Sequence, residues 1–209
     1  MSKPADALAR PDRARRSLAT EAPTATGIAA PISWAETREA LRADRAHWAR
    51  RMPGPAHLRR GYQAVWLYRV SRYAHERGWR MAAWLLWIVN GWLTGSDIPP
   101  SSRIAGGLFL PHPLGTIIAG AVGRDAAFGF QASIGGLYKP PDRDVGGGPG
   151  LPRLGDGVVL EPAALVLGAV LVGDRARIGP RCLVLKDVAA DTELEPPPWR
   201  ALPGRSGAP

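Results

Sequence analysis

Hydrophobic residues recur at two different spacings in this chain, one up to about residue 95 and another beyond it. The first is the 3.6-residue spacing of helices. Ser33 with Glu36 three residues later is the pattern of a capping box, so it predicts a helix that begins there and runs to about Arg51. Segments 58–77 and 79–93 predict two more helices. The last is apolar on nearly every side, which indicates that neighbouring elements or subunits cover it.

From Asp97 onward the hydrophobic period is six residues. Apolar residues, with one threonine, occupy this step in two registers: Ile98, Ile104, Leu110, Thr116, Val122, Phe128 and Ile134, then Leu154, Leu160, Val166, Val172, Ile178 and Val184. Neither the helical period nor simple strand alternation explains this pattern. A six-residue repeat is typical of a parallel β-helix, in which each unit forms one side of a triangular coil and its aliphatic residue points inward.

Residues 137–153, rich in proline and glycine, separate the two registers. A long excursion from a regular solenoid is usually functional. The predicted fold is therefore α+β. A disordered basic tail (1–30) and an α-helical domain (31–95) precede a parallel β-helix of about four coils (96–190, with the loop at 137–153), and a flexible C-terminal tail (191–209) follows.

The net charge of +9 is concentrated in the helical segment. Residues 31–95 hold eleven arginines and four acidic residues, whereas residues 96–209 hold eleven of each sign. A basic segment can suit nucleic acid, an acidic membrane surface or an anionic cofactor, and it can also be an ordinary solvated face. No nucleic-acid-binding motif accompanies the charge, so we expect no nucleic-acid partner.

Other features bear on location and on metals. The apolar run at 81–93 is shorter than the ~20 residues needed to cross a bilayer, and the first residues contain no apolar signal segment. Cys182 is the only cysteine, so no disulfide within the chain is possible. We therefore expect a cytoplasmic protein without a membrane partner. His112 is the only histidine outside the helical segment, and a zinc site of three histidines on the β-helix is excluded; we expect no metal.

Several motifs together resemble those of serine O-acetyltransferases, which make O-acetylserine from serine and acetyl-CoA. The resemblance spans about residues 34–190. Its motifs are Gly61-Tyr62-Gln63-Ala64, Tyr68-Arg69-Val70, Asp97-Ile98-Pro99-Pro100, Ser133-Ile134-Gly135-Gly136 and Val184-Leu185-Lys186-Asp187-Val188. The resemblance implies a left-handed β-helix, acetyl-CoA as the acyl donor, and a homotrimer or a dimer of trimers.

The resemblance also implies a catalytic pair. Acyl transfer to a hydroxyl needs a base, and histidine oriented by a carboxylate is the usual one. In the resembled enzymes an Asp and a His fifteen residues apart supply this pair, and Asp97 and His112 have that spacing. The alternative is that His112 is an ordinary corner residue between Pro111 and Pro113.

The residues that grip the amino-acid acceptor in the resembled enzymes are largely replaced. Pro111 stands where an acidic residue precedes the catalytic His, and Gly150 and Leu151 stand where an Arg and a His are expected. An Arg is the natural bidentate partner of a carboxylate, so Arg143 or Arg153 is a candidate substitute. Asp44 is the counterpart of an acceptor-binding Asp in the helical domain.

The donor in the resembled enzymes lies in a groove between subunits and is held largely by backbone groups. The corresponding positions here are Gly135, Gly136, Lys139, Ala164, Gly168, Arg181 and Lys186. The three basic residues are candidates for the phosphates of CoA, although each can equally be a solvated surface charge. The chain ends in Pro209 rather than in the isoleucine that inserts into cysteine synthase, so a complex with that enzyme is not expected.

Three interpretations remain open at this point. The chain is an O-acetyltransferase with an altered acceptor, a serine acetyltransferase with a substitute clamp, or a catalytically impaired scaffold or regulatory subunit of the same fold.

Overall fold

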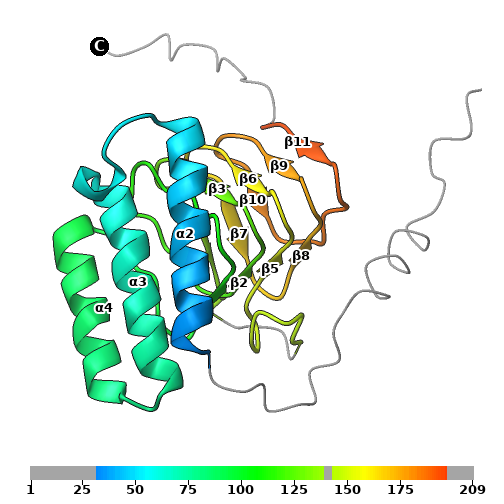
Figure 1. The fold of residues 1–209 in the computed structure, drawn as a ribbon. Helices are drawn as coiled ribbons and strands as arrows, with labels where there is room; N and C mark the ends of the chain where they lie inside the picture. The colour runs from blue at the N-terminus through cyan, green and yellow to red at the C-terminus, as the bar shows by residue number, and fades with distance from the viewer. Residues whose placement is uncertain (1–31, 139–142, 197–209) are drawn as a thin grey trace, which may run out of the picture.

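The computed structural model describes residues 32–138 and 143–196 of the 209-residue chain. The predicted basic tail, Lys139 and residues 197–209 lie outside the described residues. Three helices come first: α2 (Trp34–Arg51), α3 (Arg60–Glu76) and α4 (Arg80–Thr94), with the short 3-10 helix η1 (Ala56–Leu58) between α2 and α3. In Figure 1 the helices lie side by side, and the strands stack away from them toward β11 near the C-terminus.

The helix boundaries follow local chemistry. Ser33 is the N-cap of α2, and its side chain and that of Glu36 form the predicted capping box. These hydrogen bonds with Ser33 hold the pKa of Glu36 below its usual value. Helix α4 ends at Gly95, whose left-handed φ of 74° closes the last turn without a Cβ penalty.

The strands form three parallel sheets that the chain visits in turn. Sheet 1 contains β1 (Arg103–Ile104), β2 (Ala121–Val122), β5 (Arg153–Leu154) and β8 (Leu171–Val172). Sheet 2 contains β3 (Ala127–Phe128), β6 (Val159–Leu160), β9 (Arg177–Ile178) and β11 (Glu193–Leu194). Sheet 3 contains β4 (Ser133–Gly135), β7 (Leu165–Leu167) and β10 (Leu183–Val184). The order of visits makes a three-sided solenoid, as the six-residue period predicts.

The inward positions are those of the predicted repeat, with one correction. Twelve of the thirteen predicted residues are buried hydrophobic residues. The thirteenth, Thr116, is buried but is not the strand position: Asp97 pairs with Ile117, and Ile118 pairs with Ile134. Ile118 therefore continues the inward column of sheet 3.

This shift moves residues from one corner to the next. The inward positions Leu110 and Ile118 are eight steps apart along the chain, and Ile118 and Val122 are only four steps apart. The total of twelve preserves the overall period, which hides the shift in the sequence. The short corner requires Gly120, because a Cβ there would lie 2.4 Å from the carbonyl oxygen of Pro152. The long corner contains His112.

The solenoid extends beyond the predicted end at residue 190. Strand β11 pairs with β9 in parallel, with Glu193 opposite Arg177 and Leu194 opposite Ile178. Leu194 packs against the core, so residues 191–196 belong to the folded part. The chain steps only four residues from Val184 to Val188, the inward residue that pairs with Val172, and then six residues to Leu194. The short step takes β11 out of the six-residue register, which is why the repeat pattern does not reveal it.

Polar side chains of α2 and α3 cap the first coil. Asp44 is fully buried, and its Oδ1 accepts hydrogen bonds from the backbone N–H groups of Gly107 and Leu108, both at 2.8 Å. Arg69 forms a bidentate ion pair with Asp44 and donates to the carbonyls of Ile104 and Ala105. The first coil has no preceding coil to pair with, so these side chains satisfy backbone groups that are otherwise unpaired.

The electrostatic environment of Arg69 favours the charged form of its guanidinium. Burial opposes the charge of Arg69, but the charge of Asp44 and its hydrogen bond outweigh burial and raise the pKa of the guanidinium. Tyr68 is buried beside it and bridges the first coil through its hydroxyl, which donates to Ser102 and accepts from the N–H of Ile104. Burial raises the pKa of Tyr68.

Candidate active site

The turn that carries His112 is hydrogen-bonded to the C-cap of α4. The N–H of Gly115 donates to the carbonyl of Gly95 at 2.8 Å, and the side chain of Leu114 lies against Gly95. Within the turn, the N–H of Thr116 donates to the carbonyl of Pro113 at 3.1 Å. Prolines on both sides of His112 restrict its backbone further. The exposed imidazole therefore projects from a well-anchored turn.

Asp97 pairs in parallel with Ile117, which follows this turn in the chain. Its N–H donates to the carbonyl of Thr116, and its carbonyl accepts from the N–H of Ile118, both at 2.9 Å. The fold thus brings the backbone of Asp97 beside the end of the turn that contains His112. Asp97 is also exposed.

The carboxylate of Asp97 has a partner that the sequence did not reveal. The indole N–H of Trp87 on α4 donates to Oδ1 of Asp97 at 2.9 Å. Trp87 belongs to an apolar run, and its spacing in that run indicates only packing. Among the described residues, no hydrogen bond joins Asp97 to the imidazole of His112.

The imidazole of His112 faces an aromatic neighbour in the next coil. The ring of Phe130 meets it edge to face, with centroids 6.4 Å apart and an interplanar angle of 86°. Both residues lie at the corner between sheets 2 and 3. This corner continues along the solenoid, where Ala163 donates to the carbonyl of Phe130 and Arg181 to that of Pro162.

The three acceptor candidates are in different environments. The carboxylate of Asp44 is enclosed by Arg69 and two backbone N–H groups and has no exposed surface. Arg143 forms a bidentate ion pair with Asp187, with Nη2–Oδ2 3.0 Å, which ties the excursion loop to the corner after β10. The side chain of Arg153 of β5 lies against Gly146 of the loop, and its guanidinium forms no hydrogen bond or ion pair with any residue that the structure describes.

The donor candidates fall on two corners. Arg181 lies at the corner between sheets 2 and 3, the one that holds His112, and Ala164 follows that corner but is fully buried. Gly135, Gly136, Gly168 and Lys186 lie at the corner between sheets 3 and 1, where Leu137 packs against Gly168. The structure does not bring the two groups together within one chain.

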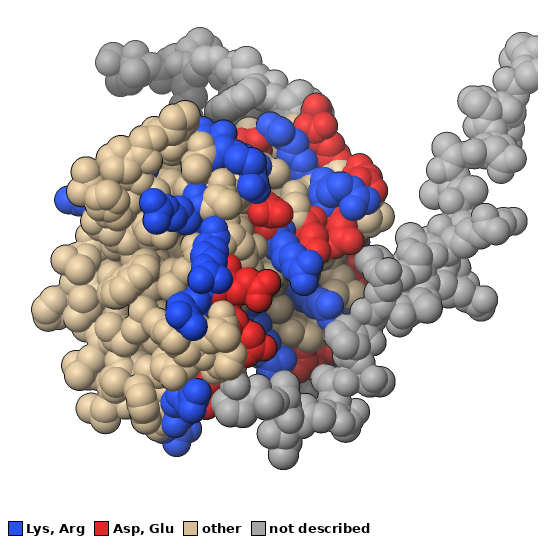
Figure 2. Space-filling view, in the orientation of Figure 1, with Lys and Arg blue, Asp and Glu red and all other residues tan. Residues whose placement is uncertain are grey.

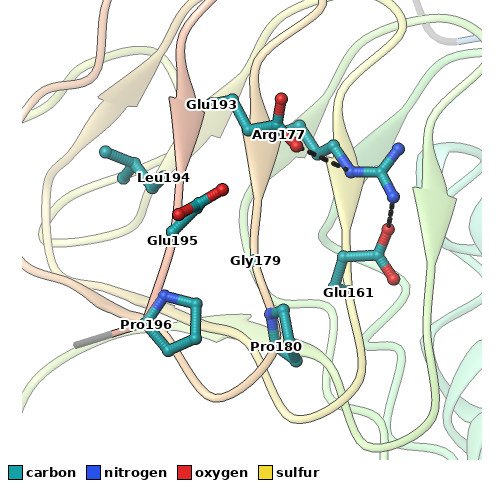
Figure 3. Close-up of a pocket in the computed structure, with 8 residues that line it drawn as sticks. All are labelled: Glu161, Arg177, Gly179, Pro180, Glu193, Leu194, Glu195 and Pro196. Carbon is teal, nitrogen blue, oxygen red and sulfur yellow. Dashed lines mark ion pairs between the residues drawn. The ribbon is translucent and has the colours of Figure 1, made fainter. Parts of the chain in front are cut away.

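A hollow of about 450 Å³ lies at the far end of the solenoid from His112 (Figure 3). Arg177 lies between Glu161 at 2.5 Å and Glu193 at 3.4 Å, and Glu195 also lines it. Three carboxylates against one guanidinium disfavour a phosphate there. In the described part of the chain, no group of three or more His, Cys, Asp or Glu side chains has the geometry to hold a metal ion.

Two exposed surfaces of the molecule are apolar. The outward positions of sheet 3 include Ile117, Leu165 and Leu183, and the exposed face of α4 adds a further set of large apolar side chains: Met81, Trp84, Leu85, Val89, Trp92 and Leu93. Figure 2 shows that charged side chains are sparse over the part of the molecule formed by α3 and α4. No described helix is long and apolar enough to span a membrane.

A three-sided solenoid of six-residue units, capped by helices and carrying a histidine on an enlarged corner, is the architecture of the hexapeptide-repeat acyltransferases. Comparison with known proteins narrows this class. The chain is 34% identical over 130 residues to the serine acetyltransferase of Helicobacter pylori, which covers 61% of this chain and 72% of that protein. The chain belongs to the serine acetyltransferase family.

A further relative in sequence and two solved structures that are similar in fold agree with this family. The serine acetyltransferase of Synechococcus elongatus is 31% identical over 144 residues, covering 68% of this chain and 57% of that protein. A crystal structure of the Neisseria gonorrhoeae enzyme in complex with serine superposes with a TM-score of 0.69 at 23% identity, over 80% of this chain and 69% of that one. A serine acetyltransferase in complex with CoA gives 0.68 at 22% identity, over 77% and 67%. No protein-family model matches the chain.

Proposed function

We propose that this chain is an acetyl-CoA-dependent O-acetyltransferase in which His112 is the general base and Asp97 orients it. The observation that carries the proposal is the enlarged corner, which presents His112 on a rigid turn hydrogen-bonded beside Asp97. The related proteins are serine acetyltransferases, and one of the structures similar in fold contains CoA. The β-helix is left-handed in this proposal, as in the family that the chain resembles.

The proposed chemistry is a direct transfer. The imidazole of His112 takes the proton of an acceptor hydroxyl while the oxygen forms a bond to the acetyl carbonyl carbon. The carbon–sulfur bond of the thioester breaks, and the sulfur leaves with the electron pair. The proton then passes from His112 to the thiolate, so His112 returns to its starting state.

The acceptor is a small hydroxyl compound that need not be serine. Pro111, Gly150 and Leu151 replace the acidic residue and the Arg-His pair expected from the family, so the usual grip on an amino acid is absent. Arg143 is engaged by Asp187, whereas Arg153 has a guanidinium without a described partner. Arg153 is therefore the better candidate for a carboxylate of the acceptor.

We further propose that the chain assembles as a homotrimer, alone or as a pair of trimers. The donor candidates occupy two different corners of one chain, and a groove between two copies would bring one corner of each together. The exposed apolar side chains of sheet 3 and α4 support an interface on that side, because such a surface is unfavourable in water.

Turnover of acetyl-CoA with a panel of acceptors tests the proposal. The panel holds L-serine, L-homoserine, L-threonine and N-acetylglucosamine, and release of CoA thiol is followed. We expect turnover with at least one acceptor and a loss of about 10²–10⁴-fold in kcat/KM for His112→Ala, the range of general-base catalysis. His57→Ala, at an exposed histidine of η1, is the matched control and should retain activity.

The pattern of turnover also separates the interpretations. Turnover with serine alone would indicate a substitute clamp, and turnover with another compound an altered acceptor. If the wild-type chain neither turns over acetyl-CoA nor binds CoA, the proposal fails and a scaffold role is favoured.

A further inference from the structure

Helix α4 and its C-cap contact Asp97 and the turn that carries His112. Trp87, at the middle of the helix, donates its indole N–H to Oδ1 of Asp97. Gly95, at its C-cap, accepts the N–H of Gly115 from the turn that carries His112. One helix therefore links to the carboxylate on one side and to the base-bearing turn on the other.

The hydrogen bond from Trp87 limits the freedom of the Asp97 side chain. The backbone of Asp97 is held on both sides by Thr116 and Ile118, so only its two side-chain torsions remain to be set. The indole N–H engages Oδ1 at 2.9 Å. Oδ2 has no hydrogen-bond partner among the described residues, so it is available to another donor.

Trp87 is on a firmly docked helix. The side-chain amide of Asn90 donates to the carbonyl of Ala64 on α3, and the hydroxyl of Ser71 donates to the carbonyl of Ala83 on α4. Thr94 then donates to the carbonyl of Asn90 and contacts the hydroxyl of Ser96. These buried contacts fix α4 against α3 and fix the start of the chain segment that leads to Asp97.

We infer that Trp87 is a positioning residue, whose indole N–H holds the carboxylate of Asp97 so that its second oxygen can orient His112. This inference rests on the proposed function. The residue acts through Asp97 and does not touch the reacting groups. An indole N–H can only donate, so it holds one carboxylate oxygen and leaves the other to accept a hydrogen bond from the imidazole N–H of His112.

The test is Trp87→Phe, which keeps an aromatic ring and removes the donor. We expect kcat with acetyl-CoA and the best acceptor of the panel to fall about tenfold, because small misplacements of catalytic groups have effects of this size or larger. The KM for acetyl-CoA should remain unchanged. The matched control is Trp66→Phe on α3, whose half-exposed ring makes no hydrogen bond with a described residue; its kcat should stay within twofold of wild type.

A double-mutant cycle separates positioning from a structural role. If Trp87 acts through Asp97, then adding Trp87→Phe to Asp97→Ala should lower kcat by less than twofold further, since effects within one network are not additive. An additional tenfold loss in that background would overturn the inference. A second result would also overturn the inference: Trp87→Phe has the kcat of the wild type while His112→Ala and Asp97→Ala are both inactive. That result would leave the proposed function intact.

A spectroscopic measurement tests the contact independently of turnover. In a ¹H–¹⁵N spectrum of the tryptophan indoles, the Trp87 signal is assigned from its absence in Trp87→Phe. It should move in Asp97→Ala while the Trp66 signal does not; an unmoved Trp87 signal would contradict the hydrogen bond. Full activity of both Asp97→Ala and His112→Ala would instead overturn the proposed function and the inference with it.

Discussion

Asp44 is the residue that most directly joins the helices to the solenoid. Its carboxylate binds Arg69 of α3 and two N–H groups of the first coil, all in a fully buried environment. A carboxylate enclosed in this way stabilises the docking of the helical part. The role that we infer for Asp44 is therefore structural, in contrast to the acceptor-binding role expected from the resemblance.

Replacement of Asp44 tests this role. Asp44→Ala leaves the charge of Arg69 and two backbone donors buried without a partner, so we expect a loss of about 3–5 kcal/mol in the free energy of unfolding, measured by urea denaturation. Asp191→Asn is the control: Asp191 pairs with Arg175 at 2.6 Å on the surface, and asparagine tolerates its left-handed φ of 58°, so the urea midpoint should stay nearly unchanged. A folded Asp44→Ala variant of wild-type stability but raised acceptor KM would support acceptor binding instead.

At the scale of elements, α3 approaches the first coil unusually closely at Gly61. A Cβ at this position would lie 1.7 Å from the carbonyl oxygen of Leu110 and 2.9 Å from the ring of Trp48. Leu110 precedes the turn that carries His112 by two residues, so this contact sets how the helix sits against the strand that leads into the candidate site.

Gly61→Ala should therefore be destabilising although alanine favours helices. We expect a loss of about 2 kcal/mol from overpacking, measured by thermal and urea unfolding. The matched control is Gly91→Ala in α4, where the added methyl would lie 3.7 Å from the carbonyl oxygen of Ser96, an ordinary van der Waals distance. That variant should be stabilised by about 0.5–1 kcal/mol through helix propensity. Equal effects of the two substitutions would show that the close approach to Leu110 is not a constraint.

At the scale of the whole molecule, the outer faces of the solenoid differ in character. Sheet 2 presents charged pairs such as Arg177 with Glu161 and Glu193, whereas sheet 3 presents Leu165 and Leu183. The apolar face of α4 adds to this contrast. The proposed interface between copies would account for these apolar surfaces, because association removes them from water.

Leu183→Asp tests the proposed assembly. A buried, unpaired carboxylate at an interface is strongly unfavourable, so light scattering after size exclusion should show a mass reduced toward the 22.3 kDa of one chain. Val159→Asp, at an outward position of sheet 2 opposite Arg177, should keep the wild-type mass. If the wild-type chain is itself a monomer, or if Leu183→Asp keeps the mass of the wild type, the proposed interface on sheet 3 is wrong.

The sequence by itself determined the helices, their capping box and twelve inward positions of the solenoid. These features depend on local periodicity and on hydrogen bonds between near neighbours, which a linear pattern records. The spacing of Asp97 and His112, together with the family resemblance, also indicated the candidate catalytic pair.

Only the tertiary structure decided which groups meet. The exchange of Thr116 for Ile118 is invisible in the period because a longer corner and a shorter one cancel. The burial of Asp44 and the hydrogen bond from Trp87 to Asp97 arise because packing of one element on another, and not spacing along the chain, determines the neighbours of a side chain.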